Sequence, residues 1–566
     1  MTSRDLTRKW VVQPEDRVRT AELARGLNVP RLIAHLLILR GVKSVEEGRR
    51  FLSPSLDGLS DPLQLTDTAV AVDRIRAALR DRERILIFGD YDVDGISGTA
   101  VLVRALRRLG HEALEYGLPN RLTEGYGLAP EHVQSAHERG VRLIITVDNG
   151  IGAHDAAARA RQLGIDLIVT DHHVPNDNLP EALAILNPKR EMAEHPAWDA
   201  SGAAVAFKLA SVLTGDIADL DLVALGLVAD IVPLRGENRD LVAAGLAVLS
   251  KTARPGLQKL AEVASLRLSE VTAGKIAFQL GPRINAGGRL GDGLAGLSLL
   301  LTESSEEAGR LAQSLNEANE ERRSIEQTIF DQAVEEIERT GPSGHGSFVL
   351  AKEGWHSGII GIVAARLVDK YYRPTVLIAV GEDGVGRGSA RSVEGFDLVV
   401  ALEPCRDLLV RFGGHKSAAG LTIQRENVEA FTAAFEEEAA KRLPVEGLQP
   451  VVNTDALVAL SEIDSRLVAL LERLQPCGYG NPSPLFCTCG VQAMPNSYRE
   501  LRGGHIRFTA KEGARIFPAV GFGLAEKATP ELLAGPVDIL FSPRFSTWHG
   551  DTMIELVVKD MRSSSE

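Results

Sequence analysis

Three aspartates at alternate positions directly follow a short apolar run, and this feature constrains the fold more than any other in the chain. The run is 85–88, and the motif after it is Gly-Asp-Tyr-Asp-Val-Asp-Gly, which spans 89–95. Ionised carboxylates this close together repel, and burying them is costly unless a cation or another partner offsets the charge. Hard divalent ions such as Mg²⁺ or Mn²⁺ are the natural partners. The motif therefore predicts a metal site at the end of a buried strand.

Two other interpretations apply to the same motif. Asp-x-Asp-x-Asp-Gly also opens an EF-hand loop, whose twelfth position is a bidentate Glu. Counting from Asp90, that position is Val101, and the segment before the motif is typical of a strand, so an EF-hand is excluded. A solvated acidic turn that caps the following helix stays open from this motif alone.

Polar side chains also follow two further apolar runs. Residues 143–147 end in Asp148-Asn149-Gly150, and residues 167–170 end in Asp171-His172-His173. Helix-period sequence separates these runs, which is typical of a parallel sheet with buried strands. Ligands of such sheets bind beyond the carboxyl ends of the strands. A helix-like apolar segment then places Asp230 before Ile-Val-Pro. All these groups are expected at one edge, in one metal site.

The expected metal ligands are Asp90, Asp92, Asp94, Asp148, His172 and Asp230. They offer oxygen and nitrogen without a thiolate, which favours Mn²⁺ or Mg²⁺ over a structural zinc ion. Their carboxylate and imidazole donor atoms together outnumber the six positions of one hexacoordinate ion. Two ions about 3.5–4 Å apart, sharing a carboxylate, fit better and suit phosphoryl chemistry, because such a pair activates water and stabilises the attacking and leaving oxygens.

In order, these motifs resemble the four motifs of the DHH phosphoesterase superfamily. The quoted segments are Gly-Asp-Tyr-Asp-Val-Asp-Gly, Val-Asp-Asn-Gly, Thr-Asp-His-His and Val-Ala-Asp-Ile-Val-Pro, and the resemblance extends to 281–290, 355–364, 388–392 and 413–420. It covers nearly the whole chain. It implies a metal-dependent, single-strand-specific DNA exonuclease that degrades 5′→3′ to mononucleotides in DNA repair and recombination. One departure is Phe88, where many members have a metal-binding His; Asp90 is expected to take its place.

The second half of the chain is expected to hold the substrate. Ser389 and Arg391 alternate along an extended segment, so both project from one face, and with Arg121 they are our choice for a pocket that holds the 5′-terminal phosphate. Two further groups are expected to contact substrate: Arg283, Asn285 and Arg289 in a glycine-bearing turn beside the scissile backbone, and Gly413, Gly414 and Lys416 at a helix N-terminus that forms an anion site. His173 and His415 are expected to act in catalysis by stabilising charge on the non-bridging oxygens. The alternatives are glycines that merely turn the chain and arginines in surface salt bridges.

Aromatic residues offer a second kind of DNA contact. Tyr116, Tyr126 and Trp355 could stack on bases, although each could equally belong to a core. Near the C-terminus, basic and aromatic side chains interleave around Gly503-Gly504, which resembles a hairpin with a nucleic-acid-facing side. These are Tyr498, Arg499, Arg502, His505, Arg507, Phe508, Lys511, Arg515 and Phe517. A solvated charged hairpin is the alternative.

The expected fold class is α/β, in several domains, because 566 residues exceed a single core. We expect an N-terminal helical region (1–60), a parallel-sheet DHH catalytic domain (61–302), a long connecting helix (303–340), a second, DHH-associated α/β substrate-binding lobe (341–443) and a C-terminal OB-like β-barrel that binds nucleic acid (444–566). The helix is predicted by apolar residues at helical intervals, with a cap-like Thr302 or Ser304 at its start and a stop at Gly341-Pro342.

Composition narrows the remaining choices. Four cysteines are too few for a disulfide framework, and no apolar run approaches the ~20 residues that span a bilayer. We therefore expect a cytoplasmic protein without membrane contact. A net charge of −13 argues against a generally basic coat, although a local basic channel can still bind DNA. Expected partners are single-stranded DNA, single-strand-binding protein and a repair helicase, and the chain is expected to be a monomer.

Three other functions share some of these features. A DHH phosphodiesterase for short oligonucleotides or cyclic dinucleotides would need no OB-like domain, and a DHH pyrophosphatase would be much shorter. A non-catalytic DNA-replication scaffold of the same superfamily would have lost metal ligands. Because each motif acid is present and an OB-like domain is expected, the exonuclease is favoured.

Overall fold

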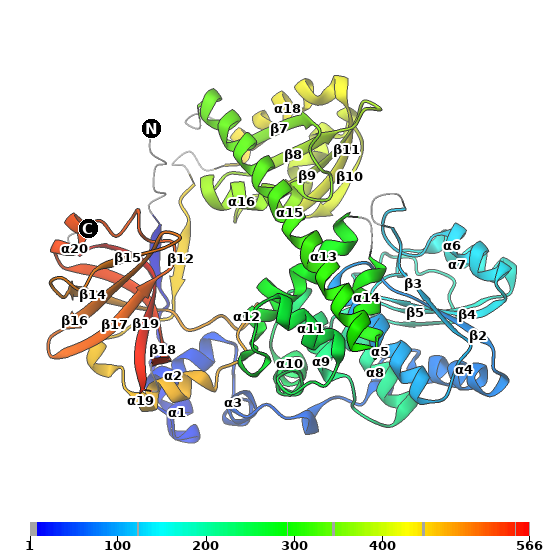
Figure 1. Cartoon of the computed structure of the whole chain (residues 1–566), viewed down its shortest axis with the longest axis horizontal. Helices are drawn as coiled ribbons and strands as arrows, with labels where there is room; N and C mark the ends of the chain where they lie inside the picture. The colour runs from blue at the N-terminus through cyan, green and yellow to red at the C-terminus, as the bar shows by residue number, and fades with distance from the viewer. Residues whose placement is uncertain are drawn as a thin grey trace.

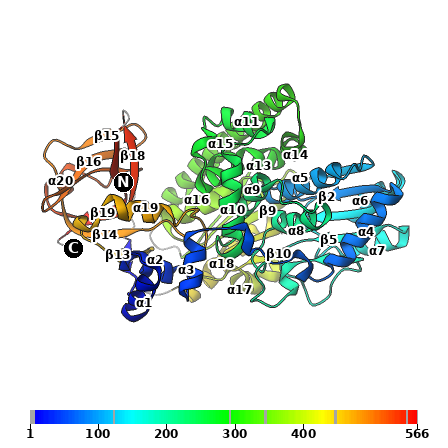
Figure 2. The same cartoon turned by 90° about the horizontal axis from the view of Figure 1, so that it is seen from below.

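The structure is a computed structural model and describes residues 8–120, 124–290, 293–341, 346–443, 448–548 and 551–564. Figure 1 shows a parallel α/β part in blue and cyan, a second α/β part in yellow-green and a β-rich part in orange and red. In Figure 2, seen from below, the β-rich part and the parallel sheet lie at opposite ends, with helices between them. The predicted fold class is confirmed.

The first sheet is parallel throughout and has the order β3-β2-β4-β5-β6. Its strands are β2 (Arg84–Phe88), β3 (Leu114–Gly117), β4 (Val141–Val147), β5 (Asp166–Thr170) and β6 (Ala184–Leu186). Alternate residues of β2 enter different cores, because successive side chains of a strand point to opposite faces. Ile85 and Ile87 pack in one core, and Leu86 and Phe88 pack in the other. This explains why the strands are apolar without alternation.

Helices cover both faces of this sheet. One face carries α4 (Thr68–Asp81), α5 (Val93–Arg108) and α8 (Gly202–Thr214), and the other carries α6 (Pro130–Glu138) and α7 (His154–Leu163). A helical group then extends the first core; it comprises α9 (Leu220–Ala229), α10 (Gly236–Leu249), α11 (Pro255–Val263), α12 (Ala273–Lys275), the π-helical turn η5 (Ile276–Leu280), α13 (Gly281–Leu290) and α14 (Leu294–Leu301).

A single long helix joins the two α/β parts. It is α15 (Ser305–Thr340), 36 residues long, and the side chain of its N-cap Ser304 accepts a hydrogen bond from Glu307 N. The first part of α15 packs in the core of the parallel-sheet region, whereas its last turns pack against the second sheet. The predicted connecting helix is confirmed.

The second sheet is mixed and has the order β10-β11-β9-β8-β7. Its strands are β7 (Phe348–Glu353), β8 (Thr375–Val380), β9 (Val385–Arg391), β10 (Leu409–His415) and β11 (Ala418–Gln424). The helices are α16 (Ile360–Tyr371), α17 (Leu398–Leu402) and α18 (Val428–Arg442). Neighbouring residues of β8 again enter different cores: Leu377 packs with α15 and α16, and Ile378 packs with α17 and α18.

The β-rich part is a closed barrel with short flanking strands. Its strands are β13 (Ala456–Leu457), β14 (Phe486–Ala493), β15 (Arg499–Leu501), β16 (His505–Glu512), β17 (Arg515–Gly521), β18 (Val537–Trp548) and β19 (Asp551–Ser563), with helices α19 (Ser465–Glu472) and α20 (Pro530–Ala534). The order is β14-β18-β19-β17-β16, and a β14–β16 pairing closes the ring. Closure removes the exposed strand edges.

The N-terminal region joins this barrel rather than the parallel sheet that follows it in sequence. Strand β1 (Lys9–Val12) pairs in parallel with β12 (Val451–Thr454). Helices α1 (Arg17–Leu27), α2 (Arg31–Leu39) and α3 (Val45–Leu52) place Leu23, Leu36 and Phe51 in the same core as Phe541 of the barrel. The two ends of the chain therefore share one apolar core, and Figure 1 shows the blue N-terminal segments beside the orange ones.

Within the described residues, the structure has no helix that is both long and apolar enough to cross a membrane.

Candidate active site

The acidic motif forms the turn between β2 and α5. Asp92 is the N-cap of α5, and its side chain accepts hydrogen bonds from Asp94 N at 2.9 Å and Gly95 N at 3.1 Å. Asp90 and Asp94 are both buried, 3% and 1% exposed. The capping interpretation therefore holds for Asp92, but a cap does not explain two further buried acids. A carboxylate at a helix N-terminus is also favoured by the helix dipole.

The other predicted ligands meet this motif at the carboxyl edge of the sheet. Nε2 of His172 lies 3.0 Å from Asp148 Oδ1, 3.6 Å from Asp230 Oδ2 and 3.9 Å from Asp94 Oδ2. Three triplets have potential ligand atoms within 4.8 Å of one another: Asp90, Asp92 and Asp148; Asp94, His172 and Asp230; and Asp148, His172 and His173. The structure thus brings together the residues that the sequence proposed as metal ligands.

The electrostatics of this cluster fit a bound cation. Burial and the neighbouring Asp92 raise the pKa of Asp94 to about 7, while burial and Asp94 raise the pKa of Asp230 to about 9. Burial and Asp94 hold the pKa of Asp148 well above its usual range. Burial and the adjacent His173 lower the pKa of His172 to about 4, which keeps the imidazole neutral as a metal ligand requires.

Two buried atoms in the cluster point to the same conclusion. Within the described residues, Asp148 Oδ1 and His172 Nε2 make no hydrogen bond although they lie close to each other. Buried polar atoms are rarely left unsatisfied. A divalent ion would satisfy both, and the mixed oxygen and nitrogen donors suit Mn²⁺ or Mg²⁺.

The N-terminus of α8 holds Asp94 in place. Asp94 accepts hydrogen bonds from Ser201 Oγ at 2.8 Å, Gly202 N at 2.6 Å and Ala203 N at 3.1 Å. A Cβ atom at Gly202 would lie 2.5 Å from the Cβ of Asp148, so glycine permits the close approach of α8 to the site. Sequence reasoning missed this support, because Ser-Gly-Ala lies more than a hundred residues from the acid that it binds.

Asp171 orients the second histidine and was also missed as a site residue. It is fully buried, and its Oδ1 accepts hydrogen bonds from His172 N, His173 N and His173 Nδ1, the last at 2.7 Å. Burial lowers the pKa of His173, but the bond to Asp171 outweighs this and raises it to about 9. His173 is therefore a cation at neutral pH, which suits contact with phosphate. The position of Asp171 directly before two histidines, at a strand end, was the available signal.

Ser389 and Arg391 project from one face of β9, as predicted, and Arg391 Nη1 lies 3.1 Å from Ser389 Oγ. A Cβ atom at Gly361, in the first turn of α16, would lie 2.8 Å from Ser389 Oγ and 3.0 Å from Arg391 Nη2. A hydroxyl, a guanidinium and a helix N-terminus therefore converge on one point, an arrangement that favours an anion. Arg121, the third residue proposed for this pocket, lies outside the described residues.

The prediction that the Gly-Gly-His-Lys segment begins a helix is wrong. Gly413, Gly414 and His415 end β10, and Lys416 lies in the turn to β11. Across the sheet His415 pairs with Ala418, which pairs with Arg391, so His415 and Arg391 lie on the same face. The segment is exposed and lies beside the anion pocket, but it forms part of a hairpin and not the start of a helix.

The predicted glycine turn around 283–289 is also wrong, because Arg283, Asn285 and Arg289 all lie in α13. Asn285 Oδ1 accepts a hydrogen bond from Val93 N at the start of α5. Arg283 Nη1 donates to Gln279 O, and Arg289 Nη1 donates to Gly358 O of the second α/β part. These contacts position helices around the site; contact with the DNA backbone stays a prediction.

Of the three aromatic residues proposed to stack on bases, one lies at the site. Tyr126 is 54% exposed, and its hydroxyl donates to Asp148 O at 2.7 Å and lies 3.2 Å from His173 Nδ1. Trp355 is buried and donates to Gln332, and Tyr116 packs against the main core, so both are structural. The C-terminal hairpin is confirmed as β15–β16, but its Phe508 and the nearby Phe517 are buried in the barrel.

Comparison with known proteins agrees with this architecture. The DHH family, N-terminal domain, matches residues 84–229, the DHHA1 domain matches 344–441 and the RecJ OB domain matches 454–560. The single-stranded-DNA-specific exonuclease RecJ of Bacillus subtilis is 36% identical over 98% of this chain and 70% of its own length. The protein of the same name from Escherichia coli is 38% identical over 82% of this chain and 84% of its own length.

Solved structures give the same result. RecJ from Thermus thermophilus in complex with Mn²⁺ is 31% identical, with a TM-score of 0.84 over 99% of this chain and 80% of that one. An exonuclease RecJ bound to manganese is 37% identical, with a TM-score of 0.59 over 68% of this chain and 97% of that one. The resemblance that the motifs indicated is confirmed, and the chain belongs to the RecJ family of DHH proteins.

Proposed function

We propose that this protein is a metal-dependent exonuclease that degrades single-stranded DNA from the 5′ end to mononucleotides, in DNA repair and recombination. The observation that carries the proposal is the pairing of a buried carboxylate and histidine cluster with an anion pocket on a second α/β part. An exonuclease needs both groups, one for hydrolysis and one to recognise a strand end. Membership of the RecJ family supports the choice of single-stranded DNA.

The residues that would hold the metal are Asp90, Asp92, Asp94, Asp148, His172 and Asp230. Two Mn²⁺ or Mg²⁺ ions there would activate water and neutralise charge on the phosphodiester, as two-metal sites do. Manganese and magnesium complexes of the Thermus thermophilus protein support this choice of ions. The α8 N-terminus fixes Asp94, so the carboxylate does not need to move when an ion binds.

The chain's own side chains then orient the substrate. The 5′-terminal phosphate lies at Ser389, Arg391 and the first turn of α16, which sets the first internal phosphodiester at the metal cluster. His173, held as a cation by Asp171, donates through its outer nitrogen to a non-bridging oxygen. His415, on the face that carries Arg391, is proposed to contact the same phosphate, and Lys416 and the adjacent glycines to contact the strand.

The barrel and the composition support the remaining proposals. A closed OB-like barrel favours long polymers over cyclic dinucleotides. Each of the four cysteines is free, which agrees with a reducing, cytoplasmic environment. We propose that the protein acts there as a monomer that meets single-strand-binding protein and a repair helicase.

The test uses oligonucleotides labelled at either end, in single- and double-stranded form, with Mn²⁺ or Mg²⁺. We expect mononucleotides from the 5′ end of the single strand, little release from a blunt duplex, and none after chelation. Internal cuts, or release from the 3′ end, would contradict the proposal. The Asp148→Ala protein controls for contaminating nucleases.

A further inference from the structure

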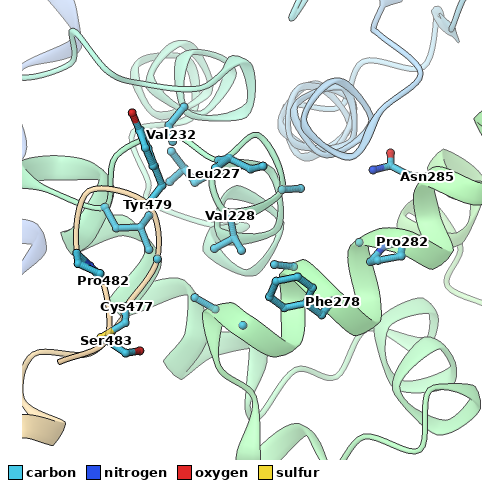
Figure 3. A pocket seen from close by; sticks show the side chains of 18 of the residues that line it. Leu227, Val228, Val232, Phe278, Pro282, Asn285, Cys477, Tyr479, Pro482 and Ser483 are labelled. Atoms are coloured by element: carbon cyan, nitrogen blue, oxygen red, sulfur yellow. The ribbon is translucent and has the colours of Figure 1, made fainter. Parts of the chain in front are cut away.

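A pocket of about 510 Å³ lies beside the metal cluster, and its lining does not include Ser389, Arg391 or Gly361. It is lined by Ala229 and Ile231, the two neighbours of Asp230, and it reaches Asn285 of α13. The pocket has two walls, one formed by the segment that carries Tyr479 and the other by the helical turn that carries Phe278. Figure 3 shows Leu227, Val228 and Val232 between them. A strand bound at the metal cluster is therefore within reach of the pocket.

The two walls present exposed aromatic rings. Phe278 of the π-helical turn η5 is 80% exposed, and Tyr479, in the segment between α19 and β14, is 63% exposed. Ile231 beside them is 66% exposed. Large apolar side chains that converge on one hollow mark a binding site rather than random exposure. Flat, exposed rings suit nucleobases, because each base has a face that can stack whatever its sequence.

A buried cation lines the same pocket. Arg322 of α15 is only 9% exposed. Its terminal nitrogens contact Glu326 and Asn319, both at 3.1 Å, but its Nε has no hydrogen-bond partner among the described residues. A buried donor without an acceptor is unfavourable. An anionic oxygen of a ligand would satisfy it, so the pocket combines aromatic faces with a donor for phosphate, the two features of a nucleotide.

The wall that carries Tyr479 is held rigidly. Arg239 is fully buried, and its guanidinium donates to backbone carbonyls that precede the wall: those of Arg473, Leu474, Gln475 and Pro476, together with Phe51. Tyr479 O accepts a hydrogen bond from Leu234 N at 2.8 Å. The wall is thus built before any ligand arrives, and a preformed site loses less entropy on binding.

We propose that this pocket binds one nucleotide of the single strand on the 3′ side of the scissile bond, with its base against Phe278 and Tyr479 and a phosphate oxygen on Arg322 Nε. This inference rests on the proposed function and adds a position-specific subsite to it. The loop 475–483 continues into β14, so one side of the subsite is formed by the chain segment that leads into the barrel. A peptide would not need the phosphate donor, and a free mononucleotide would not need a pocket open to the metal cluster.

The test is a scan of single abasic sites along a 5′-phosphorylated oligonucleotide. For the unaltered protein we expect one abasic position, within a few nucleotides of the scissile bond, to raise Kd by about 5- to 150-fold, the ~1–3 kcal/mol of one stacked base. Phe278→Ala and Tyr479→Ala should raise Kd for intact DNA and remove the penalty at that position. Phe278→Tyr and Tyr479→Phe should retain it, because they keep a ring. Val18→Ala, an exposed apolar position on α1, is the distant control.

A second scan replaces single phosphates by uncharged methylphosphonates. One position should weaken binding to the unaltered protein but not to Arg322→Gln, while Arg322→Lys should keep part of the effect. Near-UV and far-UV circular dichroism of each variant checks the fold. A flat abasic scan for an unaltered protein that still degrades single strands would overturn the subsite and leave the proposed function intact. No cleavage of single strands by the unaltered protein would instead refute the proposed function.

Discussion

Burial and neighbouring carboxylates hinder ionisation of Asp94, Asp148 and Asp230 at the metal site. In the metal-free protein the pKa of Asp94 is raised to about 7, and those of Asp230 and His173 are raised to about 9. A group whose pKa is higher in the folded state contributes stability that is lost as the pH rises through that pKa. His172, with its lowered pKa, acts in the opposite direction, but only between about pH 4 and 6.5.

The first prediction follows for the window from about pH 6.5 to 9. Without metal, the free energy of unfolding should fall across this window, because Asp94, Asp230 and His173 each lose protons that the folded state had retained. With saturating Mn²⁺ the fall should be much smaller, because the ions stabilise the ionised carboxylates. Urea titrations at several pH values, with chelator or with Mn²⁺, measure this. A metal-free stability that rises from pH 6.5 to 9 would contradict it.

The second prediction concerns the ligands themselves. Asp148→Ala or His172→Ala should lower kcat by about 10³-fold or more, since ions supply several kcal/mol of transition-state stabilisation and ~1.36 kcal/mol is tenfold. Metal-free Asp148→Ala should unfold at no lower temperature than the unaltered protein, because the substitution removes a buried carboxyl oxygen that has no hydrogen-bond partner among the described residues. Mn²⁺ should then no longer raise the melting temperature. Asp155→Ala, an exposed acid at the start of α7, is the matched control.

The third prediction concerns the strand end. If Ser389 and Arg391 hold the terminal phosphate, a 5′-hydroxyl substrate should have a lower kcat/KM by about 10- to 150-fold, from the ~1.5–3 kcal/mol of a charged hydrogen bond. Arg391→Ala should remove this preference, and Arg391→Lys should restore little of it, because lysine lacks the planar fork. Equal slowing of both substrates by Arg391→Ala would show instead that this residue contacts the internal backbone.

Residues at strand ends were predictable, whereas those that support them were not. Asp148 and His172 stand out because each follows an apolar run, and parallel strands end at one edge. Ser201 and Gly202 carry no local signal, since their role is to bind an acid on another element. Phe278, Tyr479 and Arg322 are likewise separated by long stretches of sequence, and only the fold brings them to one pocket.

Among single elements, the first turn of α16 has the most direct role in the proposed function, because the phosphate is proposed to lie where a Cβ at Gly361 would meet Ser389 and Arg391. The fourth prediction is that Gly361→Ala lowers the preference for a 5′-phosphate while the melting temperature stays the same or rises. Alanine is favoured over glycine inside helices by about 1 kcal/mol, but its methyl group would occupy the pocket. The measurements are kcat/KM for 5′-phosphate and 5′-hydroxyl substrates, and thermal unfolding.

Gly309→Ala in α15 is the matched control, since a Cβ there contacts nothing within 4 Å. It should give the helical gain in stability without any change in substrate preference. An unchanged preference in Gly361→Ala would argue that the phosphate lies elsewhere on the sheet.

Glycines account for the two elements that the sequence placed wrongly. In 281–290 they suggested a turn, but a Cβ at Gly288 would lie 2.9 Å from Tyr91 O, so glycine lets α13 pack closely against the metal motif. In 413–415 they suggested a helix start, but Gly414 has φ of 146° and a Cβ there would lie 2.4 Å from Ala418 O. Glycine that serves close packing and glycine that serves a turn look alike in a sequence.

Across the whole molecule, strand and helix order was predictable, but the association of the chain's two ends was not. The N-terminal helices were expected to be a peripheral region, yet Ile33, Leu36 and Leu37 are fully buried in the core that includes the barrel. Their apolar face is as visible in the sequence as any other, but nothing local identifies its partner more than 400 residues away. Arg239 adds a second link, because its carbonyl partners come from both ends of the chain.

This arrangement changes how the barrel is best removed, and it leads to the fifth prediction. Truncation after Leu443 alone should give an aggregation-prone protein, because the core faces of α1–α3 become exposed. A protein of residues 54–443 lacks those helices too and should fold, since the parallel sheet, α15 and the second sheet keep their own cores.

The protein of residues 54–443 should cleave very short oligonucleotides, because the metal cluster and the proposed phosphate pocket lie within it. On long single strands it should bind more weakly, with a flatter dependence of log Kd on log salt, by about 0.7 for each phosphate that the shortened protein no longer neutralises. Unchanged affinity and salt slope for long DNA would show that the barrel does not bind the strand and serves another partner.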